Sequence, residues 1–289
     1  MGRKTIAVLS GKGGTGKTFV SVNLACVSAP STYVDCDAEE PNGHLYFKPQ
    51  GFRAQKIDVP LPRVDSARCD GCRKCMDFCA YHALAWANGS LLVFDELCHG
   101  CAGCVMVCPN HALSEVRRNI GEIREGMSGR VRVLSGFLNP GEASGMPIIK
   151  ALLERKNGGA GEFIFVDCPP GSSCMVSESV KDADYCVLVA EPTLFGAHNL
   201  KMVHELVQLH EKPCGAVLNK CLPGDDPSLD YCRAEGIPIL ARIPFDEELG
   251  LLNSNASIAV LESERYRLLF RELLLEIETE VPDAAAGHP

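Results

Sequence analysis

Residues 5–29 read TIAVLSGKGGTGKTFVSVNLACVSA, and the fold of the chain follows from this stretch. The apolar run 5–9 predicts a short strand, and the run that begins at Phe19 predicts a helix. Between them, residues 11–18 fit G-x-x-x-x-G-K-T, a glycine-rich loop whose backbone N–H groups can surround phosphate oxygens. A strand before this pattern and a helix after it are the setting that a phosphate-binding loop requires, so we expect a nucleotide site here.

The loop also supplies the side chains that such a site needs. We expect Lys17 to contact the β- and γ-phosphates and the hydroxyl of Thr18 to bind magnesium. A chance match in an unrelated loop is the alternative, and the flanking strand and helix disfavour it. The residues expected to hold the nucleotide phosphates are Gly11, Lys12, Gly13, Gly14, Thr15, Gly16, Lys17 and Thr18.

Further apolar runs predict more strands of the same sheet. Residues 163–167 (FIFVD), 185–193 (YCVLVAEPT) and 214–220 (CGAVLNK) each read as a buried strand, and they alternate with helical stretches such as 197–210. Alternation of this kind predicts an α/β fold, in which helices cover both faces of a mostly parallel sheet.

Carboxylates occur where two predicted strands end. The strand 31–37 (STYVDCD) ends in acids, Asp35 and Asp37, and the strand 163–167 ends in Asp167. Beside a phosphate-binding loop, such carboxylates can hold the water shell of magnesium or orient an attacking water. Either acid of the first strand could instead cap the following loop, and for Asp35 the two roles remain equally open.

Composition limits the classes of function. The 289 residues are 46% hydrophobic and 22% charged, enough for one large domain and a small one. A net charge of -9 without a Lys/Arg-rich run argues against a nucleic-acid partner. The chain has no apolar run long enough to cross a bilayer, and it starts with a strand rather than a signal peptide. We therefore expect a cytoplasmic protein with no membrane partner.

Two cysteine clusters interrupt the alternation of strands and helices. C-x2-C-x2-C-x3-C occurs at 69–79 and again at 98–108, within two segments of similar sequence that are 29 residues apart, CDGCRKCMDFCAYHAL and CHGCAGCVMVCPNHAL. This tandem duplication favours iron–sulfur clusters, although C-x2-C pairs also suit tetrahedral zinc. In a chain of this length without an export signal, thiolate ligands are expected rather than disulfides.

The segment KGGTGKT, with Lys12 inside the loop, resembles the deviant Walker A motif of the MinD, ParA, Mrp and nitrogenase iron-protein group of ATPases. The resemblance implies that ATP binds with magnesium and that Lys12 acts on the nucleotide of a dimer partner; a solvated loop lysine is the alternative. Asp37, in D-x-D-x3-P-N, resembles the first switch aspartate of the family. Asp167 and the Pro-Pro-Gly after it resemble the second switch. The implied catalytic residues are Lys12, Lys17, Asp37 and Asp167.

The same resemblance extends to the base of the nucleotide. Asn219 corresponds to the asparagine that reads adenine through its amide. Residues 241–246 (ARIPFD), which include Pro244, resemble the loop that packs on the base. The acidic end of the last predicted helix lacks the lysines and arginines of a membrane anchor, so we expect this helix to pack on the sheet.

Each cysteine repeat resembles half of a bacterial two-cluster ferredoxin, in which three cysteines bind one 4Fe-4S cluster and the fourth binds the other. The resemblance assigns one cluster to Cys69, Cys72, Cys75 and Cys108, and the second to Cys98, Cys101, Cys104 and Cys79. One departure is Ala80, where the second repeat has the family's usual proline, Pro109. His82 and His111 occupy matched positions and are expected to be packing or surface residues.

The remaining cysteines, at 26, 36, 168, 174, 186, 214, 221 and 232, are expected to pack in the core. Cys174 is the exception, because it follows Asp167 at the spacing at which the nitrogenase iron protein places a ligand of its intersubunit cluster. Residues 134–149 contain no cysteine to match the second ligand of that arrangement, which argues against a bridging cluster.

These expectations divide the chain into four parts: an ATPase domain in two segments, 1–62 and 117–280, a ferredoxin-like α+β insertion at 63–116, and a disordered tail at 281–289. The expected function is ATP hydrolysis in a homo- or heterodimer, coupled to electron transfer through two 4Fe-4S clusters to a redox partner. The alternative is an ATP-dependent carrier or scaffold that assembles iron–sulfur or other metal cofactors. Positioning on a membrane or nucleoid would need an anchor or a basic patch that the sequence lacks.

Overall fold

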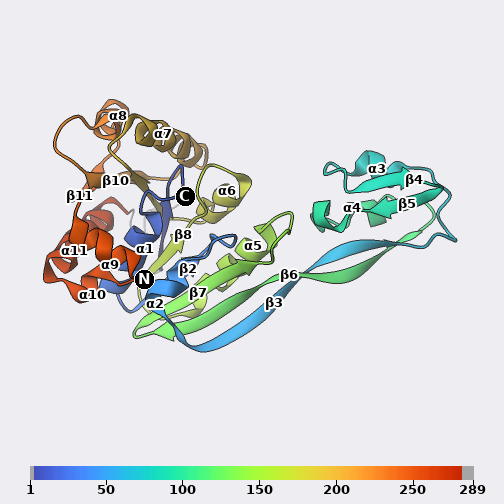
Figure 1. Ribbon diagram of the computed structural model, residues 1–289, viewed down its shortest axis with the longest axis horizontal. Helices are drawn as coiled ribbons and strands as arrows, with labels where there is room; N and C mark the ends of the chain where they lie inside the picture. Colours follow the sequence, from blue (N-terminus) through green and yellow to red (C-terminus); the bar gives the residue numbers. More distant parts are fainter. Residues whose placement is uncertain (1–2, 282–289) are drawn as a thin grey trace, which may run out of the picture.

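The structure is a computed structural model that describes residues 3–281. Its main feature is a nine-stranded sheet in the order β11-β10-β9-β1-β8-β2-β7-β6-β3, shown in Figure 1. Every neighbouring pair from β11 to β7 is parallel, whereas β6 and β3 are antiparallel to their neighbours. The predicted α/β fold with a mostly parallel sheet is therefore confirmed.

The strands are β1 (Lys4–Leu9), β2 (Ser31–Asp35), β3 (Gln50–Val64), β4 (Leu84–Ala87), β5 (Ser90–Val93), β6 (Leu113–Ser128), β7 (Val131–Leu138), β8 (Phe163–Asp167), β9 (Tyr185–Ala190), β10 (Cys214–Cys221) and β11 (Ile239–Pro244). The helices are α1 (Lys17–Val27), α2 (Gly43–Phe47), α3 (Lys74–Phe78), α4 (Gly103–Met106), α5 (Met146–Arg155), α6 (Cys174–Val180), α7 (Leu194–Leu209), α8 (Pro227–Glu235), α9 (Glu247–Ser254), α10 (Ala259–Glu262) and α11 (Glu264–Glu280). Two short 3-10 turns lie at Asp95–Leu97 and Lys156–Gly158.

Helices cover both faces of the sheet because successive side chains of each strand point to opposite sides. In β1, Ala7 and Leu9 belong to a core with α5, α6, α7 and α8, whereas Ile6 and Val8 belong to a second core with α1, α9, α10 and α11. Helix α11 places Tyr266 in this second core, so the expectation that it packs on the sheet is confirmed.

Strands β3 and β6 form a long antiparallel arm that the sequence did not predict. The last pair between β6 and β7 is Gly121 with Leu138, yet the β3–β6 ladder continues for seven further pairs, to Val64 with Leu113. At 3.4 Å per residue, the arm extends roughly 24 Å beyond the sheet. Because β6 runs opposite to the parallel strands, it leaves the sheet at their carboxyl ends, the edge at which the phosphate-binding loop follows β1.

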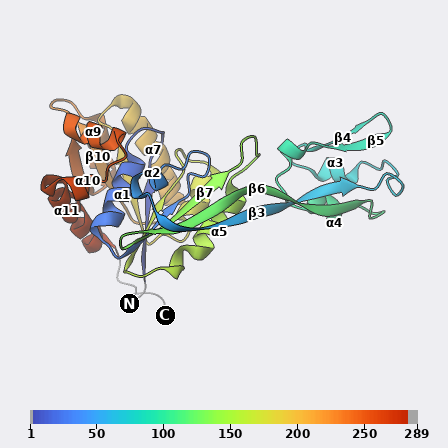
Figure 2. The same ribbon diagram turned by 60° about the horizontal axis from the view of Figure 1, so that its bottom comes forward.

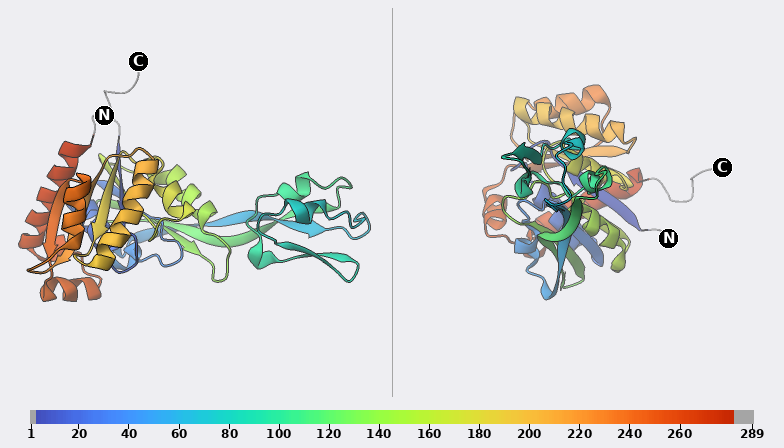
Figure 3. Two further views of the ribbon diagram at one scale, coloured as in Figure 1. Left: turned by 90° about the horizontal axis from the view of Figure 1, so that it is seen from above. Right: turned by 90° about the vertical axis from the view of Figure 1, so that its right-hand side faces the viewer.

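A small cysteine-rich module, residues 65–112, sits at the far end of this arm (Figure 2 and the left view of Figure 3). It consists of the hairpin β4–β5 and the short helices α3 and α4, around a core that includes Leu84 and Leu91. The module also packs against the arm. Gly100 lies so close to β3 that a methyl group placed on it would be 2.8 Å from Cβ of Val59. The module is therefore packed on the arm as well as connected to it.

The arm tolerates Pro60 and Pro62 because β3 is the edge strand of the sheet, where a residue without an N–H group can face solvent. The expected boundaries at 62/63 and 116/117 fall inside β3 and β6, so the arm is shared between the expected ATPase domain and the expected insertion.

Within the described residues, no helix combines the length and apolar character needed to cross a membrane. Of the tail expected at 281–289, residues 282–289 lie outside the described part of the chain.

Candidate functional site

The phosphate-binding loop lies between β1 and α1, as the sequence predicts. Gly16 precedes the first residue of α1 with a φ of 96°, a left-handed conformation that glycine adopts without strain. A side chain at Gly11 would collide with the backbone carbonyl of Asn199 in α7, so the loop and this helix touch directly. The hydroxyl of Thr15 is buried and has no hydrogen-bond partner within residues 3–281, as expected for a group that awaits a ligand oxygen.

Lys17 and Asp167 form a buried ion pair beneath this loop. Nζ of Lys17 lies 2.6 Å from Oδ1 of Asp167, and the hydroxyl of Tyr33 donates to Oδ2 at 2.9 Å. Burial opposes the charge on Lys17, but the charge of Asp167 and its hydrogen bond outweigh this effect and raise the pKa of Lys17. Lys17 therefore keeps its positive charge, and its contact with Asp167 joins the loop to the end of β8.

The two acids after β2 differ in their contacts. Strand β2 ends at Asp35, two residues earlier than predicted, and the buried Asp35 carboxylate accepts hydrogen bonds from the N–H groups of Gly43 at 2.9 Å and Asp37 at 3.3 Å. This contact is the loop-capping role considered for Asp35. Asp37 lines the cavity above the phosphate-binding loop, and burial raises its pKa to about 6.

Two adjoining cavities extend along the loop. The first combines the basic groups of Lys12 and Lys17 with the carboxylate of Asp37, and the second has more apolar walls. The first is lined by Ser10, Lys12, Gly13, Gly14, Gly16, Lys17, Thr18, Phe19, Asp37, Glu40, Asn42, Leu45, Tyr46, Pro170, Asn253, Ser254 and Ala256. The second is lined by Gly14, Gly16, Phe19, Asn219, Lys220, Pro244, Phe245, Asp246, Leu249, Gly250 and Asn253.

The second cavity contains both residues that the sequence assigned to the base, Asn219 and Pro244. Nδ2 of Asn219 donates to the carbonyl of Thr15 at 2.7 Å, which leaves the amide oxygen of Asn219 as an acceptor. The ring of Phe245 is 58% exposed and forms an apolar wall. Phe245 belongs to the segment 241–246 that was expected to pack on the base, whereas sequence reasoning missed Phe19 of α1, whose position beside the cavity depends on how this helix packs.

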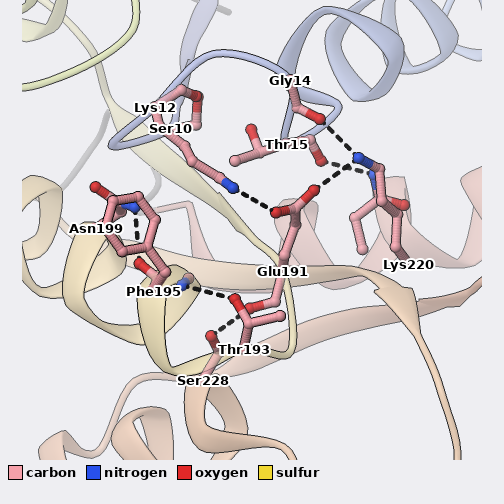
Figure 4. Close-up of polar contacts among 12 residues, drawn as sticks. Ser10, Lys12, Gly14, Thr15, Glu191, Thr193, Phe195, Asn199, Lys220 and Ser228 are labelled. Atoms are coloured by element: carbon pink, nitrogen blue, oxygen red, sulfur yellow. Dashed lines mark hydrogen bonds and ion pairs between the residues drawn. The ribbon is translucent and has the colours of Figure 1, made fainter.

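Lys12 is held by a carboxylate that sequence reasoning missed. Nζ of Lys12 lies 2.7 Å from Oε2 of Glu191, and Nζ of Lys220 lies 2.6 Å from Oε1 (Figure 4). Lys220 also donates to the carbonyl of Gly14 at 2.7 Å. Glu191 directly follows β9, which ends three residues before the predicted boundary. A carboxylate at the end of a parallel strand was the available signal.

The eight motif cysteines separate into two cavities in the module. Each cavity contains three cysteines of one repeat and the fourth cysteine of the other. The first is lined by Cys69, Cys72, Cys75 and Cys108 together with Trp86, Leu91 and Pro109, among others. The second is lined by Cys79, Cys98, Cys101 and Cys104 together with Pro62, Phe78 and Leu84, among others. The structure therefore brings together the two sets that the sequence resemblance assigned.

The two repeats also share an unusual backbone. Positive φ angles occur at three matched pairs, each 29 residues apart: Gly71 and Gly100, Arg73 and Ala102, and His82 and His111. Burial matches as well, since Cys75 and Cys104 are buried, and Cys72 and Cys101 are exposed. The matched histidines are turn residues whose N–H groups donate to the carbonyls of the fourth cysteines, Cys79 and Cys108. Neither histidine lines the cavities.

Within residues 3–281, no group of three or more His, Cys, Asp or Glu side chains is arranged to hold a single metal ion. Most of the remaining cysteines are buried or half-buried in the body, as expected. Cys174 is exposed at the start of α6. It lies outside the two cysteine cavities.

Comparison with known proteins agrees with this geometry. Residues 6–258 match the CobQ/CobB/MinD/ParA nucleotide binding domain. The chain is 35% identical over 191 residues to uncharacterized protein MJ0578 of Methanocaldococcus jannaschii, a match that covers 65% of this chain and 67% of the relative.

Two solved structures share the fold. The cell division ATPase MinD of Pyrococcus furiosus has a TM-score of 0.60 at 20% identity, over 96% of this chain and 99% of that one. The septum site-determining protein MinD of Pyrococcus horikoshii, complexed with Mg-ADP, has a TM-score of 0.58 at 18% identity, over 96% of both chains. The family match spans most of the sequence and includes the phosphate-binding loop, and the chain therefore belongs to the CobQ/CobB/MinD/ParA nucleotide-binding domain family.

Proposed function

We propose that this protein is an iron–sulfur ATPase, which binds and hydrolyses Mg-ATP as a dimer and couples its nucleotide state to electron transfer through two 4Fe-4S clusters. One observation carries the proposal. The β3–β6 arm leaves the sheet at the edge that bears the phosphate-binding loop, so the cysteine module stands on the nucleotide side of the body. A change at the nucleotide site can therefore reach the module through the arm or through a partner that contacts both.

In this proposal the nucleotide phosphates lie against the loop 11–18. Lys17 would neutralise the β- and γ-phosphates, and Thr18 would bind the magnesium ion, as in other loops of this pattern. Asp167, which already contacts Lys17 at 2.6 Å, would hold the water shell of the metal. Asp37, in the same cavity, would orient the attacking water and respond to the γ-phosphate.

The base would occupy the second cavity, between Phe19 and Phe245. The free amide oxygen of Asn219 would accept a hydrogen bond from the exocyclic amino group of adenine. Pro244 would contribute an apolar surface to the same side of the cavity. An amino group at this position distinguishes adenine from guanine, so we expect ATP to be preferred over GTP.

A dimer of like ATPases, either two copies of this chain or this chain with a related one, would bring the two nucleotide sites face to face. Lys12 lies at the rim of its own site with its side chain one third exposed, a position from which it can reach a partner. In the proposed dimer, Lys12 of each copy contacts the nucleotide of the other and stabilises negative charge on the phosphates.

The residues of the module fit two 4Fe-4S clusters. Each cavity is lined by four cysteines, a set of thiolate ligands that suits a cube of iron and sulfide. Cys69, Cys72, Cys75 and Cys108 would hold one cluster, and Cys98, Cys101, Cys104 and Cys79 the other. When bound, such clusters carry single electrons. We therefore propose residues 63–116 as the electron-carrying unit and a redox protein as its partner.

Exposure of Cys72 and Cys101 favours a second candidate function, a carrier that assembles or delivers iron–sulfur or other metal cofactors. One exposed ligand in each set would allow an acceptor protein to approach the cluster. Transfer to an apo-protein in the presence of a chelator that traps free iron would support this candidate. A cluster that stays on the protein under these conditions would exclude it.

Coupling between two sites is reciprocal, so reduction of the clusters must change the affinity for ATP if ATP changes the clusters. We would reconstitute the protein anaerobically with iron and sulfide and measure the dissociation constant of a non-hydrolysable Mg-ATP analogue before and after chemical reduction. A threefold or larger change would support coupling. Equal affinities in the two redox states, in protein with full iron content, would contradict it.

A further inference from the structure

The carboxylate of Glu191 bridges two lysines at the rim of the nucleotide site (Figure 4). Its two oxygens lie 2.7 Å from Nζ of Lys12 and 2.6 Å from Nζ of Lys220. Burial alone would raise the pKa of Glu191, but the hydrogen bonds and charges of both lysines lower it. The carboxylate is therefore ionised and shared.

Glu191 is firmly placed by its own backbone. Its carbonyl accepts hydrogen bonds from the hydroxyl of Ser228 at 2.6 Å and from the N–H of Thr193 at 2.8 Å. The side chain of Thr193 in turn accepts from the N–H of Gly196 and caps α7. Only 14% of the Glu191 side chain is exposed. The carboxylate is thus a fixed point at the junction of β9 and α7.

The two lysines differ in how they are held. Lys220 is also bound to the carbonyl of Gly14 at 2.7 Å, and its backbone adopts a left-handed φ of 60° at the end of β10. Lys12 has no second polar partner for its ammonium group within residues 3–281 and lies 5.6 Å above the ring of Phe195. Lys12 is therefore the lysine that can leave, while Lys220 remains to balance the charge of Glu191.

We propose that Glu191 is a positioning residue that holds Lys12 within its own subunit and releases it when a second copy of the chain closes over the nucleotide. This inference rests on the proposed dimer. The ammonium group of Lys12 must move away from Glu191 to reach the nucleotide of the other subunit. Because Lys220 stays in place, the release leaves no unbalanced carboxylate, so both positions of Lys12 are accessible. Closure therefore replaces the ion pair between Lys12 and Glu191 with a contact between Lys12 and the nucleotide phosphates of the other subunit.

The Glu191 contact consequently opposes self-association. A partly exposed ion pair contributes up to about 1 kcal/mol, which corresponds to roughly a fivefold change in an equilibrium constant. A symmetric dimer releases two such lysines. Removing the charge of Glu191 should therefore lower the dissociation constant of the dimer by roughly 5- to 25-fold. This effect should require Lys12, because it comes from the release of that side chain.

The test measures self-association of the full chain by sedimentation equilibrium, with a non-hydrolysable Mg-ATP analogue at saturation. Glu191→Gln keeps the shape and the acceptor oxygen, so the contact between Lys220 and Gly14 should survive. We expect its dimer dissociation constant to fall by roughly 5- to 25-fold. Nucleotide affinity should stay within about twofold, because Lys17 and Thr18 are untouched. Glu205→Gln, on the exposed side of α7, is the matched control and should leave association unchanged.

Two further variants separate release of Lys12 from a merely structural effect. Glu191→Asp keeps the charge and should associate like the wild type. In the background of Lys12→Ala, the change Glu191→Gln should produce no gain, since no lysine remains to be released. The inference is overturned if Glu191→Gln associates like the wild type, or if its gain persists without Lys12.

The same experiment separates this inference from the proposed dimer. If the wild type dimerises with the analogue but Glu191→Gln changes nothing, only the role of Glu191 is wrong. If wild type and variant both bind the analogue yet remain monomers at every concentration, the proposed dimer of two copies of this chain is wrong, and the role of Glu191 falls with it.

Discussion

Lys17 and Asp167 are 150 residues apart in the chain, yet their side chains meet 2.6 Å apart beneath the phosphate-binding loop. Both side chains are almost fully buried, so each is the main compensation for the charge of the other. The hydroxyl of Tyr33 adds a hydrogen bond to the second oxygen of Asp167 at 2.9 Å. The contact ties the loop after β1 to the end of β8 and makes nucleotide binding and fold stability depend on one ion pair.

Removing one member of this pair should therefore affect stability as well as turnover. Asp167→Asn leaves a buried ammonium group without its closest counter-charge and should lower the free energy of unfolding by roughly 3 kcal/mol. Lys17→Met combined with Asp167→Asn removes both charges and should recover most of this loss. All variants should lose ATP hydrolysis. Urea unfolding and a phosphate-release assay measure the two effects, and an Asp167→Asn protein as stable as the wild type would contradict the account.

Asp37 should make stability depend on pH in the direction opposite to that of a carboxylate whose pKa is lowered by folding. Burial raises its pKa to about 6 from an ordinary 3.8, so the folded state favours the protonated form. Its ionisation thus costs stability above pH 6, and this cost disappears as the pH falls toward 4.

The comparison with Asp37→Asn isolates this effect from other titrating groups. The variant should be more stable than the wild type at pH 7.5, and the difference should shrink steadily as the pH is lowered to 5. Thermal unfolding of both proteins across this range gives the result. A difference that stays constant with pH would mean that the Asp37 carboxyl does not titrate there.

Close contact between the phosphate-binding loop and α7 predicts different effects for two neighbouring glycines. A methyl group at Gly11 would collide with the carbonyl of Asn199, whereas one at Gly13 would meet no atom within 4 Å. Gly11→Ala should therefore weaken binding of Mg-ATP by at least about tenfold, because the loop must shift to relieve an overpacked contact. Gly13→Ala should bind within a few-fold of the wild type. Isothermal titration calorimetry compares them, and equal affinities would contradict the packing.

Several parts of this structure follow from local sequence pattern, and others do not. The strand, loop and helix around residues 11–18 were predictable because apolar runs and glycine spacing are local signals. The β3–β6 arm was missed because Pro60, Pro62 and many charged residues obscure its alternation, and its register depends on partners that are 49 to 77 residues away in the chain. Its placement on the nucleotide side depends on strand order, which no local pattern contains.

The candidate site likewise contains residues that the sequence predicts and residues that it does not. Lys17, Thr18 and Asp167 were found because each belongs to a motif or ends a strand. The fourth cysteines, Cys79 and Cys108, could be placed only through resemblance to a known arrangement, since spacing alone assigns each to its own repeat. Glu191 was overlooked because its importance arises from two lysines that are far away in the sequence.

The crosswise arrangement of cysteines predicts the result of paired substitutions. Cys69 and Cys108 line one cavity, so replacing both with serine should remove a single cluster and leave about half of the iron. Replacing Cys69 and Cys79 affects both cavities and should remove nearly all of it. Cys214→Ser, in the body of the protein, is the control and should keep full iron content. Iron and sulfide analysis after anaerobic reconstitution distinguishes the cases, and the reverse order of the two double variants would show that each repeat binds its own cluster.

The most direct test of coupling between the nucleotide site and the module is an anaerobic redox titration followed by EPR. The midpoint potentials would be measured without nucleotide, with Mg-ADP and with a non-hydrolysable Mg-ATP analogue. We predict that the analogue shifts at least one potential by about 60 mV relative to Mg-ADP, a tenfold change in the equilibrium constant of a one-electron couple. Potentials that are the same in all three conditions, in protein shown to bind the analogue, would contradict nucleotide control of the clusters.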